Sequence, residues 1–220
     1  MKADLHTHSM FSPDALSKPD SFARFAKNAG LGAIALTDHN TTRGWGPVRQ
    51  AVEAEGLLFI PGEEIKVYDG PKCAGEILGL FLNEHIPAGP RDDVLDRIRQ
   101  QDALAFVAHP FDWMRHPFVR LEDYVKKVDG IEVHNAGTLF SGINDRARRF
   151  AVEHRLPGSA GSDAHLPGEI GRAWIETDAS DLEGLRFKMK QGAFFAHGGY
   201  SSLEVHFYLR FSRLTGRKLR

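Results

Sequence analysis

The sequence predicts an α/β protein built on a mostly parallel sheet or barrel. Short apolar runs alternate with segments of helical periodicity, which is the order expected of β-α units. The expected strands are continuous apolar runs, as strands are when helices cover the sheet. The chain has no low-complexity tract, glycine/serine linker or internal repeat, and its 220 residues suffice for one large core. We therefore expect residues 1–220 to form a single domain.

In the first half of the chain, glycines mark the ends of the expected helices. Gly30 follows one helical segment and Gly56 follows the next, and glycine is common just past a helix C-terminus. A turn-rich stretch, "YDGPKCAG", separates two further strands. The expected elements are a strand at 3–5, a helix at 19–28, a strand at 33–37, a helix at 47–55, and strands at 57–60 and 76–82.

In the second half, Val94, Leu95 and Ile98 recur at helical spacing and predict a helix at 91–101. Short apolar runs and helical segments then continue to the C-terminal part of the chain. The further expected elements are strands at 105–108, 130–133, 158–160, 173–176 and 193–196, and helices at 121–128, 144–154 and 181–191.

Composition excludes several classes of protein. The formal net charge is -1, so the total charge gives no sign of a polyanionic partner. Cys73 is the only cysteine, which excludes an intramolecular disulfide and suits a reducing cytoplasm. No apolar run approaches the roughly 20 residues of a membrane-spanning helix, and the N-terminus lacks a signal-peptide pattern. We expect a cytoplasmic protein without a transmembrane segment.

The segment at 207–220 is rich in arginine and lysine and has no acidic residue. Two interpretations are open. Its basic and aromatic residues could contact anionic lipid or nucleic acid, or it could be a terminal helix that packs by its apolar face. The near-neutral total charge favours the second interpretation.

Metal-binding residue types follow six of the predicted strands. In α/β barrels the active site forms at the carboxyl ends of the strands, so side chains far apart in the sequence are expected to meet there. These side chains belong to His6 and His8, Asp38 and His39, Glu63 and Glu64, His109, His134, and Asp163 and His165.

The chemistry of these side chains indicates a metal site. His6 and His8 are two residues apart, and such side chains point to the same face of a strand. Imidazoles and carboxylates without a thiolate suit Zn²⁺, Mn²⁺ or Fe²⁺ in hydrolytic sites, and burying them without a partner is costly. His134 taken alone is more often a hydrogen-bonded structural residue than a ligand.

The candidate ligands outnumber the four or five donors that one such ion takes. We therefore expect two or three divalent ions that share bridging carboxylates. Sites of this kind clamp anionic oxygen-rich groups and lower the pKa of a bridging water, which makes phosphate esters the expected substrates. The candidate ligands are His6, His8, Asp14, His39, Glu64, His109, His134, Asp163 and His165.

Several motifs occur in an order that resembles one family. They are "DLHTHS" with Asp14 in "FSPDA", then "TDHN", "PGEEI", "AHP", "EVHN" and "GSDAH", with "EIGRAWIETD" and "GAFFAHGG" further on. Together they resemble the polymerase and histidinol phosphatase (PHP) superfamily of metal-dependent phosphoesterases. The resemblance implies a distorted (β/α)7 barrel, similar to a TIM barrel, with up to three metal ions in its mouth.

The resemblance also implies roles for individual residues. His6, His8, Glu64 and Asp163 would hold one ion, Asp14, His39 and His165 a second, and His109 and His134 a third. Glu64, which directly precedes Ile65, would be the bridging carboxylate. The implied mechanism is in-line attack on phosphorus by a metal-bridging hydroxide, with Glu64, His39, Asp163 and His165 as the catalytic residues. Asp38 would orient a ligand imidazole or cap a helix.

Cationic residues near the ligand motifs could contact the substrate phosphate or be solvated surface charges. The candidates are Arg43, Lys66, Arg172 and His197. The substrate could be a small phosphomonoester, a nucleotide or the end of an oligonucleotide. Histidinol phosphate is a less favoured substrate, because no acidic loop for its amine is evident.

Two other functions are considered. Metal-dependent amide hydrolysis also occurs in histidine-rich barrels, but no lysine is placed at a strand end to bridge two ions. A catalytically silent metal-binding or regulatory module would be expected to lack a ligand, whereas every expected position is filled. We therefore expect a metal-dependent hydrolase of phosphoric ester bonds.

Overall fold

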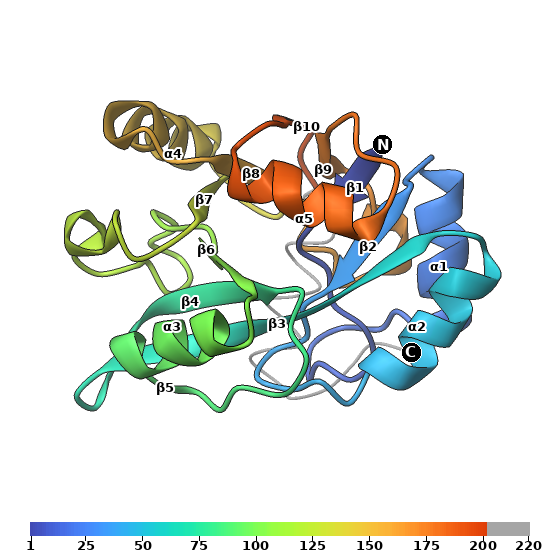
Figure 1. Cartoon of the computed structure of the whole chain (residues 1–220), viewed down its shortest axis with the longest axis horizontal. Helices are drawn as coiled ribbons and strands as arrows, with labels where there is room; N and C mark the ends of the chain where they lie inside the picture. The colour runs from blue at the N-terminus through green and yellow to red at the C-terminus, as the bar shows by residue number, and fades with distance from the viewer. Residues whose placement is uncertain (202–220) are drawn as a thin grey trace.

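The computed structural model of the chain describes residues 1–201, and within this range ten strands form one sheet (Figure 1). Their order is β10-β9-β1-β2-β3-β4-β6-β7-β8, and β5 pairs with β3. The strands are β1 (Lys2–Asp4), β2 (Ala33–Leu36), β3 (Leu58–Asp69), β4 (Lys72–Leu80), β5 (Gly89–Pro90), β6 (Leu104–Val107), β7 (Gly130–Asn135), β8 (Gly158–Gly161), β9 (Ala173–Glu176) and β10 (Phe195–Gly198).

The sheet curls into a nearly closed barrel. Its last strand, β8, lies close to both β9 and β10 at the opposite edge. Just beyond these edges, the backbone N–H of Ser201 donates to Ala136 O at 2.7 Å. The predicted α/β barrel is therefore confirmed.

The sheet contains more antiparallel pairs than expected. β1, β2 and β3 are parallel, and so are β6, β7 and β8. These two groups are joined by β4, which is antiparallel to both β3 and β6, and β9 is antiparallel to β1 and β10. The cause at β3–β4 is a tight turn at Gly70, whose φ is +58°, because strands joined by a tight turn must run in opposite directions.

The strand predicted at 57–60 is in fact part of the long strand β3. Glu63 and Glu64 therefore lie inside a strand and do not follow its end. The hairpin with β4 explains the extension, because its pairing runs from Gly62–Leu80 to Asp69–Lys72. The strand predicted at 76–82 is likewise the second half of β4.

Five α-helices occur within residues 1–201. They are α1 (Pro19–Asn28), α2 (Trp45–Ala54), α3 (Arg91–Gln100), α4 (Ser141–His154) and α5 (Leu182–Lys190), with 3-10 turns η1 (Leu121–Tyr124) and η2 (Pro167–Glu169). In Figure 1, α1 and α2 lie together on one side of the sheet, and α3 lies against the β3–β4 hairpin. The helix expected at 121–128 is only the η1 turn, which anchors the chain by burying Leu121 and Tyr124.

The core forms three apolar layers that leave one end of the barrel for polar groups. One layer packs α1 and α2 against β2, and a second packs α3 and α4 against β3, β4 and β6. The third fills the barrel interior, where Leu185 and Met189 of α5 join small strand residues such as Ala33 and Ala35. Helix α5 therefore helps to fill the barrel, and the ligand motifs gather at the carboxyl ends of the parallel strands.

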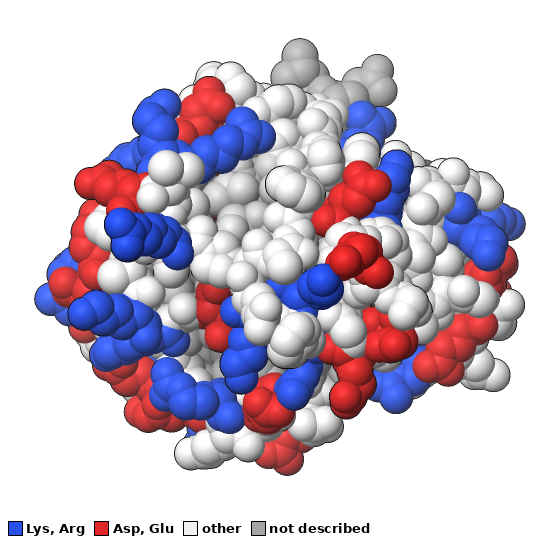
Figure 2. Space-filling model, turned by 45° about the horizontal axis from the view of Figure 1, so that its top comes forward, with Lys and Arg blue, Asp and Glu red and all other residues white. Residues whose placement is uncertain are grey.

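The surface in view carries mixed charge. Figure 2 shows lysine and arginine side chains interspersed with aspartate and glutamate on that face. None of the helices within residues 1–201 is long and apolar enough to cross a membrane. The basic segment predicted at 207–220 lies outside the described residues.

Gly161, at the end of β8, provides a test of the packing beneath the ligand motifs. A Cβ at this position would overlap the Cβ and the backbone nitrogen of His6. We expect Gly161→Ala to lower the free energy of unfolding by about 1–3 kcal/mol, because the overlap forces β1 and β8 apart. The measurement is urea unfolding followed by circular dichroism.

The matched control is Gly142→Ala in α4, where a Cβ would meet nothing within 4 Å. This substitution should leave stability unchanged or raise it by up to about 1 kcal/mol, since it lowers the entropy of the unfolded chain. Equal unfolding midpoints for the two variants would contradict the packing described for Gly161.

Candidate metal centre

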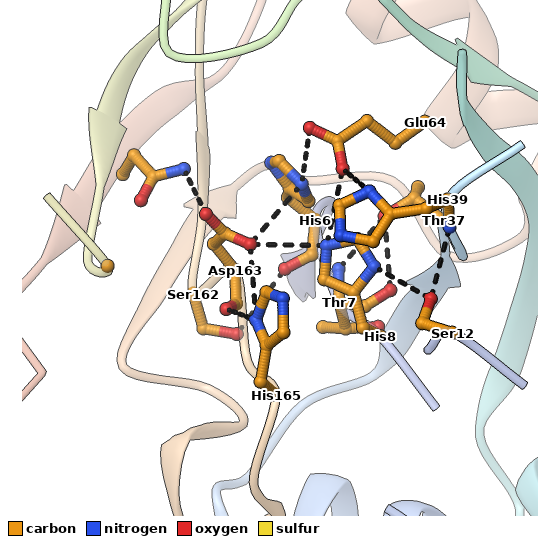
Figure 3. Close-up of polar contacts among 12 residues, drawn as sticks. His6, Thr7, His8, Ser12, Thr37, His39, Glu64, Ser162, Asp163 and His165 are labelled. Atoms are coloured by element: carbon orange, nitrogen blue, oxygen red, sulfur yellow. Dashed lines mark hydrogen bonds and ion pairs between the residues drawn. The ribbon is translucent and has the colours of Figure 1, made fainter. Parts of the chain in front are cut away.

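The predicted ligands other than His134 converge at the carboxyl ends of the parallel strands, and Figure 3 shows several of them. His6 and His8 follow β1, His39 follows β2, His109 follows β6, and Asp163 and His165 follow β8. Isolated bridges between Thr7 and Ala164 and between His39 and Glu64 bring these segments together. Every histidine of the cluster thus follows the carboxyl end of a strand, as expected from the sequence.

Glu64 reaches the cluster by a different route. Side chains alternate between the two faces of a strand, and in β3 the residues Ile65 and Val67 pack into the outer layer with α3. Glu64 and Lys66 therefore face the barrel interior, on the same side as Ile60. On the neighbouring strand β4 the same alternation turns Glu76 inward.

Glu64 lies at the centre of the imidazoles. Its Oε1 is 3.0 Å from His109 Nε2 and 3.4 Å from His6 Nε2. Its Oε2 is 2.7 Å from His39 Nδ1 and 3.5 Å from His8 Nε2. Each oxygen of this buried carboxylate therefore faces two imidazoles, and Figure 3 shows how the rings gather around it.

Asp163 forms a second focus next to Glu64. Its Oδ1 is 3.1 Å from His8 Nε2 and 3.6 Å from His6 Nε2. The donor atoms of His6, His8 and Asp163 lie within 4.8 Å of one another, as required for binding one cation.

A third group of donors forms around Asp14. One oxygen of Asp14 is 3.5 Å from His39 Nε2, and the other is 3.5 Å from His165 Nε2. The rings of His39 and His165 both lie close to that of His8, with centroids 4.3 and 4.4 Å away. The geometry therefore brings together the residues that the resemblance assigned to a second ion.

Glu76 is a site residue that sequence reasoning missed. Its Oε2 is 3.6 Å from His109 Nε2, and its donor atoms group with those of His39 and Glu64. Lys66 Nζ is 4.0 Å from Glu76 Oε1. The sequence signal that could have indicated Glu76 is the alternation of inward and outward side chains along β4. It becomes informative only when the pairing of β4 with β3 is known.

His134 is not brought into any of these groups. Its Nε2 is 2.9 Å from Gly199 O, and Arg148 donates a hydrogen bond to its Nδ1. Both ring nitrogens are thus engaged outside the cluster, by partners from α4 and from the turn after β10.

Of the four residues predicted to contact the substrate phosphate, one lies at the cluster and three do not. Lys66 lines a cavity of about 370 Å³ together with Asp14, His39 and His109. The other three candidates are not among the residues that line it: Arg172 donates to Tyr200 O at 3.1 Å, His197 Nε2 lies 3.5 Å from Glu176, and Arg43 is exposed.

Glu132, within β7, holds two of the predicted ligands in place and was also missed. Its Oε1 lies 3.0 Å from His6 Nδ1, and its Oε2 accepts the backbone N–H of His109 at 2.9 Å. Neighbouring imidazoles keep the pKa of this buried carboxyl low despite its desolvation, so it accepts from the Nδ1–H of His6. Nε2 of His6, on the side of Glu64 and Asp163, is then the nitrogen that a cation would bind when it displaces the second proton of the ring.

Arg115 and Asp38 are linked to different members of the cluster. Arg115 donates to Asp163 Oδ2, the oxygen that faces away from the imidazoles.

Asp38 accepts from the hydroxyls of Ser9 and Ser12 at 2.6 and 2.7 Å, and Ser12 Oγ lies 3.4 Å from His8 Nδ1. Asp38 is thus linked to His8 through Ser12, and it is not the N-cap residue of α2, which is Gly44.

The electrostatics of the cluster reflect close pairing of imidazoles with carboxylates. Burial acts to lower the pKa of His6, but Glu132 and Glu64 raise it to about 10. For His39, Glu64 and Asp14 likewise overcome burial and raise the pKa to about 10. Burial and the neighbouring His39 hold the pKa of His8 well below its usual value. Protons on His6 and His39 thus offset carboxylate charge in the protein without metal.

The residues fit divalent metal ions. His6 Nε2 is buried and makes no hydrogen bond within the described residues, and a polar atom in that state is costly unless a cation binds beside it. The donors are imidazole nitrogens and carboxylate oxygens, the combination found in catalytic Zn²⁺, Mn²⁺ and Fe²⁺ sites.

Fold and site together define a class, the α/β barrels that carry a histidine and carboxylate cluster at the mouth. Residues 4–132 match the family model of the PHP domain, and residues 143–193 match the model described as PHP-associated. The chain belongs to the PHP family, whose phosphoesterases are metal-dependent, so the resemblance found in the sequence is confirmed.

Two relatives and one solved structure show the range of the family. The uncharacterized protein MJ1587 of Methanocaldococcus jannaschii is 35% identical over 174 residues, which are 73% of this chain and 96% of the relative. The 3',5'-nucleoside bisphosphate phosphatase of Chromobacterium violaceum is 28% identical over 232 residues, which cover 92% of this chain and 79% of that enzyme.

The solved structure supports the fold. It is a two-domain protein from Bacteroides vulgatus that contains a predicted PHP-like metal-dependent phosphoesterase. The TM-score is 0.74 at 24% identity, and the match covers 90% of this chain and 65% of the other.

The pairing of imidazoles with carboxylates predicts how the metal-free protein responds to pH. A histidine whose pKa is raised from 6.5 to about 10 stabilises the fold fully below pH 6.5 and loses that contribution as the pH rises to 10. We therefore expect the Tm of chelator-treated protein to fall over this range. Added Zn²⁺ should stabilise the protein more as the pH rises, because the ions displace these protons.

Thermal unfolding at a series of pH values, with chelator and with Zn²⁺, is the measurement. If the Tm of the chelator-treated protein did not change between pH 6.5 and 10, the proposed protonation of His6 and His39 would be wrong.

The role of Glu132 can be tested by Glu132→Gln. The amide keeps the shape of the side chain but loses the charge that fixes the tautomer of His6, so metal affinity should fall about 10- to 100-fold. Competition with a chelating dye measures this affinity. Glu183→Gln, an exposed substitution on α5, is the matched control and should bind metal like the parent; equal affinities for both variants would exclude the role given to Glu132.

Proposed function

We propose that this protein is a metal-dependent phosphoesterase that binds two or three divalent ions, Mn²⁺, Zn²⁺ or Fe²⁺, at the mouth of its barrel. The observation that carries the proposal is the position of Glu64, whose two carboxylate oxygens each face two imidazoles. A single carboxylate in that position can be shared between neighbouring ions, and paired ions are characteristic of phosphate-ester hydrolysis.

The ligand assignment follows the three groups of donors. His6, His8, Glu64 and Asp163 would hold one ion, and Asp14, His39 and His165 a second. For a third position, Glu64, His109 and Glu76 supply donors, and we leave His134 out because its ring nitrogens are engaged elsewhere. Glu64, His39, Asp163 and His165 remain the residues that we propose to be catalytic.

The chain's own residues prepare the cavity for a phosphate ester. Bound divalent ions would supply charge that neutralises phosphate oxygens and lowers the pKa of water. Glu132 and Arg115 keep His6 and Asp163 oriented, so little reorganisation is needed when the ions bind. Lys66, which lines the cavity, would add a positive charge next to the phosphate.

The shape of the cavity favours an accessible phosphate at the end of a molecule. The cavity of about 370 Å³ is lined by His39, whose side chain is 20% exposed, so the cluster is open on that side. A small phosphomonoester, a nucleotide or an oligonucleotide end would fit this opening. We propose this substrate range for a domain that spans residues 1–220.

The activity is tested with protein loaded with Mn²⁺, using an aryl phosphate, an aryl phosphodiester and an aryl amide as substrates. We expect turnover of a phosphate ester that a chelator abolishes. His39→Ala and Asp163→Ala should each lower kcat/KM by at least about 100-fold, since both remove ligands whose loss weakens metal binding.

His154→Ala is the matched control, because it removes an imidazole at the end of α4, outside the clustered donors. It should keep the activity of the parent. Hydrolysis of the amide alone, or no hydrolysis of phosphate esters by metal-loaded protein, would overturn the proposed function. Unchanged activity in His39→Ala and Asp163→Ala would show that the chemistry occurs elsewhere.

A further inference from the structure

Two large aromatic side chains are exposed side by side. Trp113 is 68% exposed and Phe140 is 50% exposed. Their ring centroids are 6.1 Å apart and their planes differ by only 15°. The two residues come from different loops, one after β6 and one between β7 and α4. Exposed aromatic surface of this size is unfavourable in water, and where it forms a contiguous patch it commonly marks a binding site.

The aromatic pair is carried by loops that lie next to the metal-centre cavity. Met114, Arg115 and His116, which directly follow Trp113, line this cavity together with the ligands His39 and His109. The loop that presents Trp113 is therefore also one wall of the active site.

Arg115 joins the two loops that carry the pair. Its guanidinium donates to Asp163 in the cluster and to Gly137 O at 3.0 Å. Gly137 belongs to the loop that carries Phe140, so one side chain ties both aromatic loops to a predicted metal ligand. The loops that carry the two rings are thus tied to the cluster beside which a phosphate would bind.

The chemistry of this rim suits a ligand with a phosphate at one end and an aromatic ring at the other. Metal ligands and Lys66 meet the phosphate in the cavity, and the aromatic pair offers π-faces outside it. Nucleobases stack on exposed aromatic side chains, and this stacking is tolerant of sequence because every base has a π-face. A base-free sugar phosphate has no such ring.

We propose that Trp113 and Phe140 form a nucleobase-stacking site, and that the substrate is a nucleotide or the end of an oligonucleotide. The proposal rests on the phosphoesterase function proposed above and narrows its substrate class. In this proposal the aromatic pair contacts the base and not the reacting phosphate. Its role is to determine which phosphate esters bind.

The test compares AMP with ribose 5-phosphate, which carries the same phosphate without the base. Steady-state kinetics of the Zn²⁺-loaded full chain should give a KM for AMP about 10-fold below that for ribose 5-phosphate, the gain expected from one stacked base. In Trp113→Ala/Phe140→Ala the KM for AMP should rise to the value for ribose 5-phosphate. kcat for both substrates, and KM for ribose 5-phosphate, should not change.

A second measurement does not depend on turnover. AMP should quench the tryptophan fluorescence of the Zn²⁺-loaded parent protein, and ribose 5-phosphate should not. Trp113→Phe keeps a stacking surface but removes the indole whose fluorescence is measured. It should therefore abolish the quenching while its KM for AMP stays close to that of the parent. The Tm of each variant should match the parent, because both side chains are exposed.

The outcomes separate the two proposals. If no phosphate ester is hydrolysed, the proposed function fails, whereas quenching by AMP that Trp113→Phe abolishes still supports the stacking site. If both substrates have the same KM and neither quenches, the stacking site is wrong and the phosphoesterase proposal stands. The stacking site would also be wrong if the double variant showed an equal rise in KM for ribose 5-phosphate. It would be wrong as well if the double variant bound nucleotide normally and differed from the parent only in its sedimentation coefficient.

Discussion

The structure depends on one buried carboxylate that is surrounded by imidazoles. Glu64 is 1% exposed, and four histidines from three strand ends approach its two oxygens. Without cations, the protein keeps this charge buried because neighbouring histidines hold protons, and in return the pKa of Glu64 falls well below its usual value. Three apolar layers hold the barrel together, and the cluster lies at one end of it.

Around this cluster, a second layer of buried polar groups contacts several of the rings, among them His6 and His8. Asp4 illustrates the cost: burial raises its pKa to about 6, although it accepts backbone N–H groups from Ser162 and Gly171. Such groups make little net contribution to stability. They join the end of β1 to the loops after β8, and so set the distance between His6 and Asp163.

Much of this site was predictable from the sequence, because a histidine or aspartate that directly follows an apolar strand can be recognised from neighbouring residues alone. His6, His8, His39, His109 and His165 all follow strands as expected. Glu64 was found through its motif, although it lies inside β3. Glu76, Glu132 and Arg115 could not be found in this way, since their positions depend on strand register and on a loop that crosses the site. The partners of His134 come from α4 and the turn after β10, which no local pattern connects to it.

The bridge between Thr7 and Ala164 has a consequence for the order of folding. The donors of a complete site come from both ends of this stretch of chain, and contacts of such long sequence separation form late, after the cost of closing large loops has been met. A growing chain holds only a partial set of ligands until His165 has been synthesised. A metal ion that needs the complete set of donors would therefore bind only after the two ends of this stretch have met.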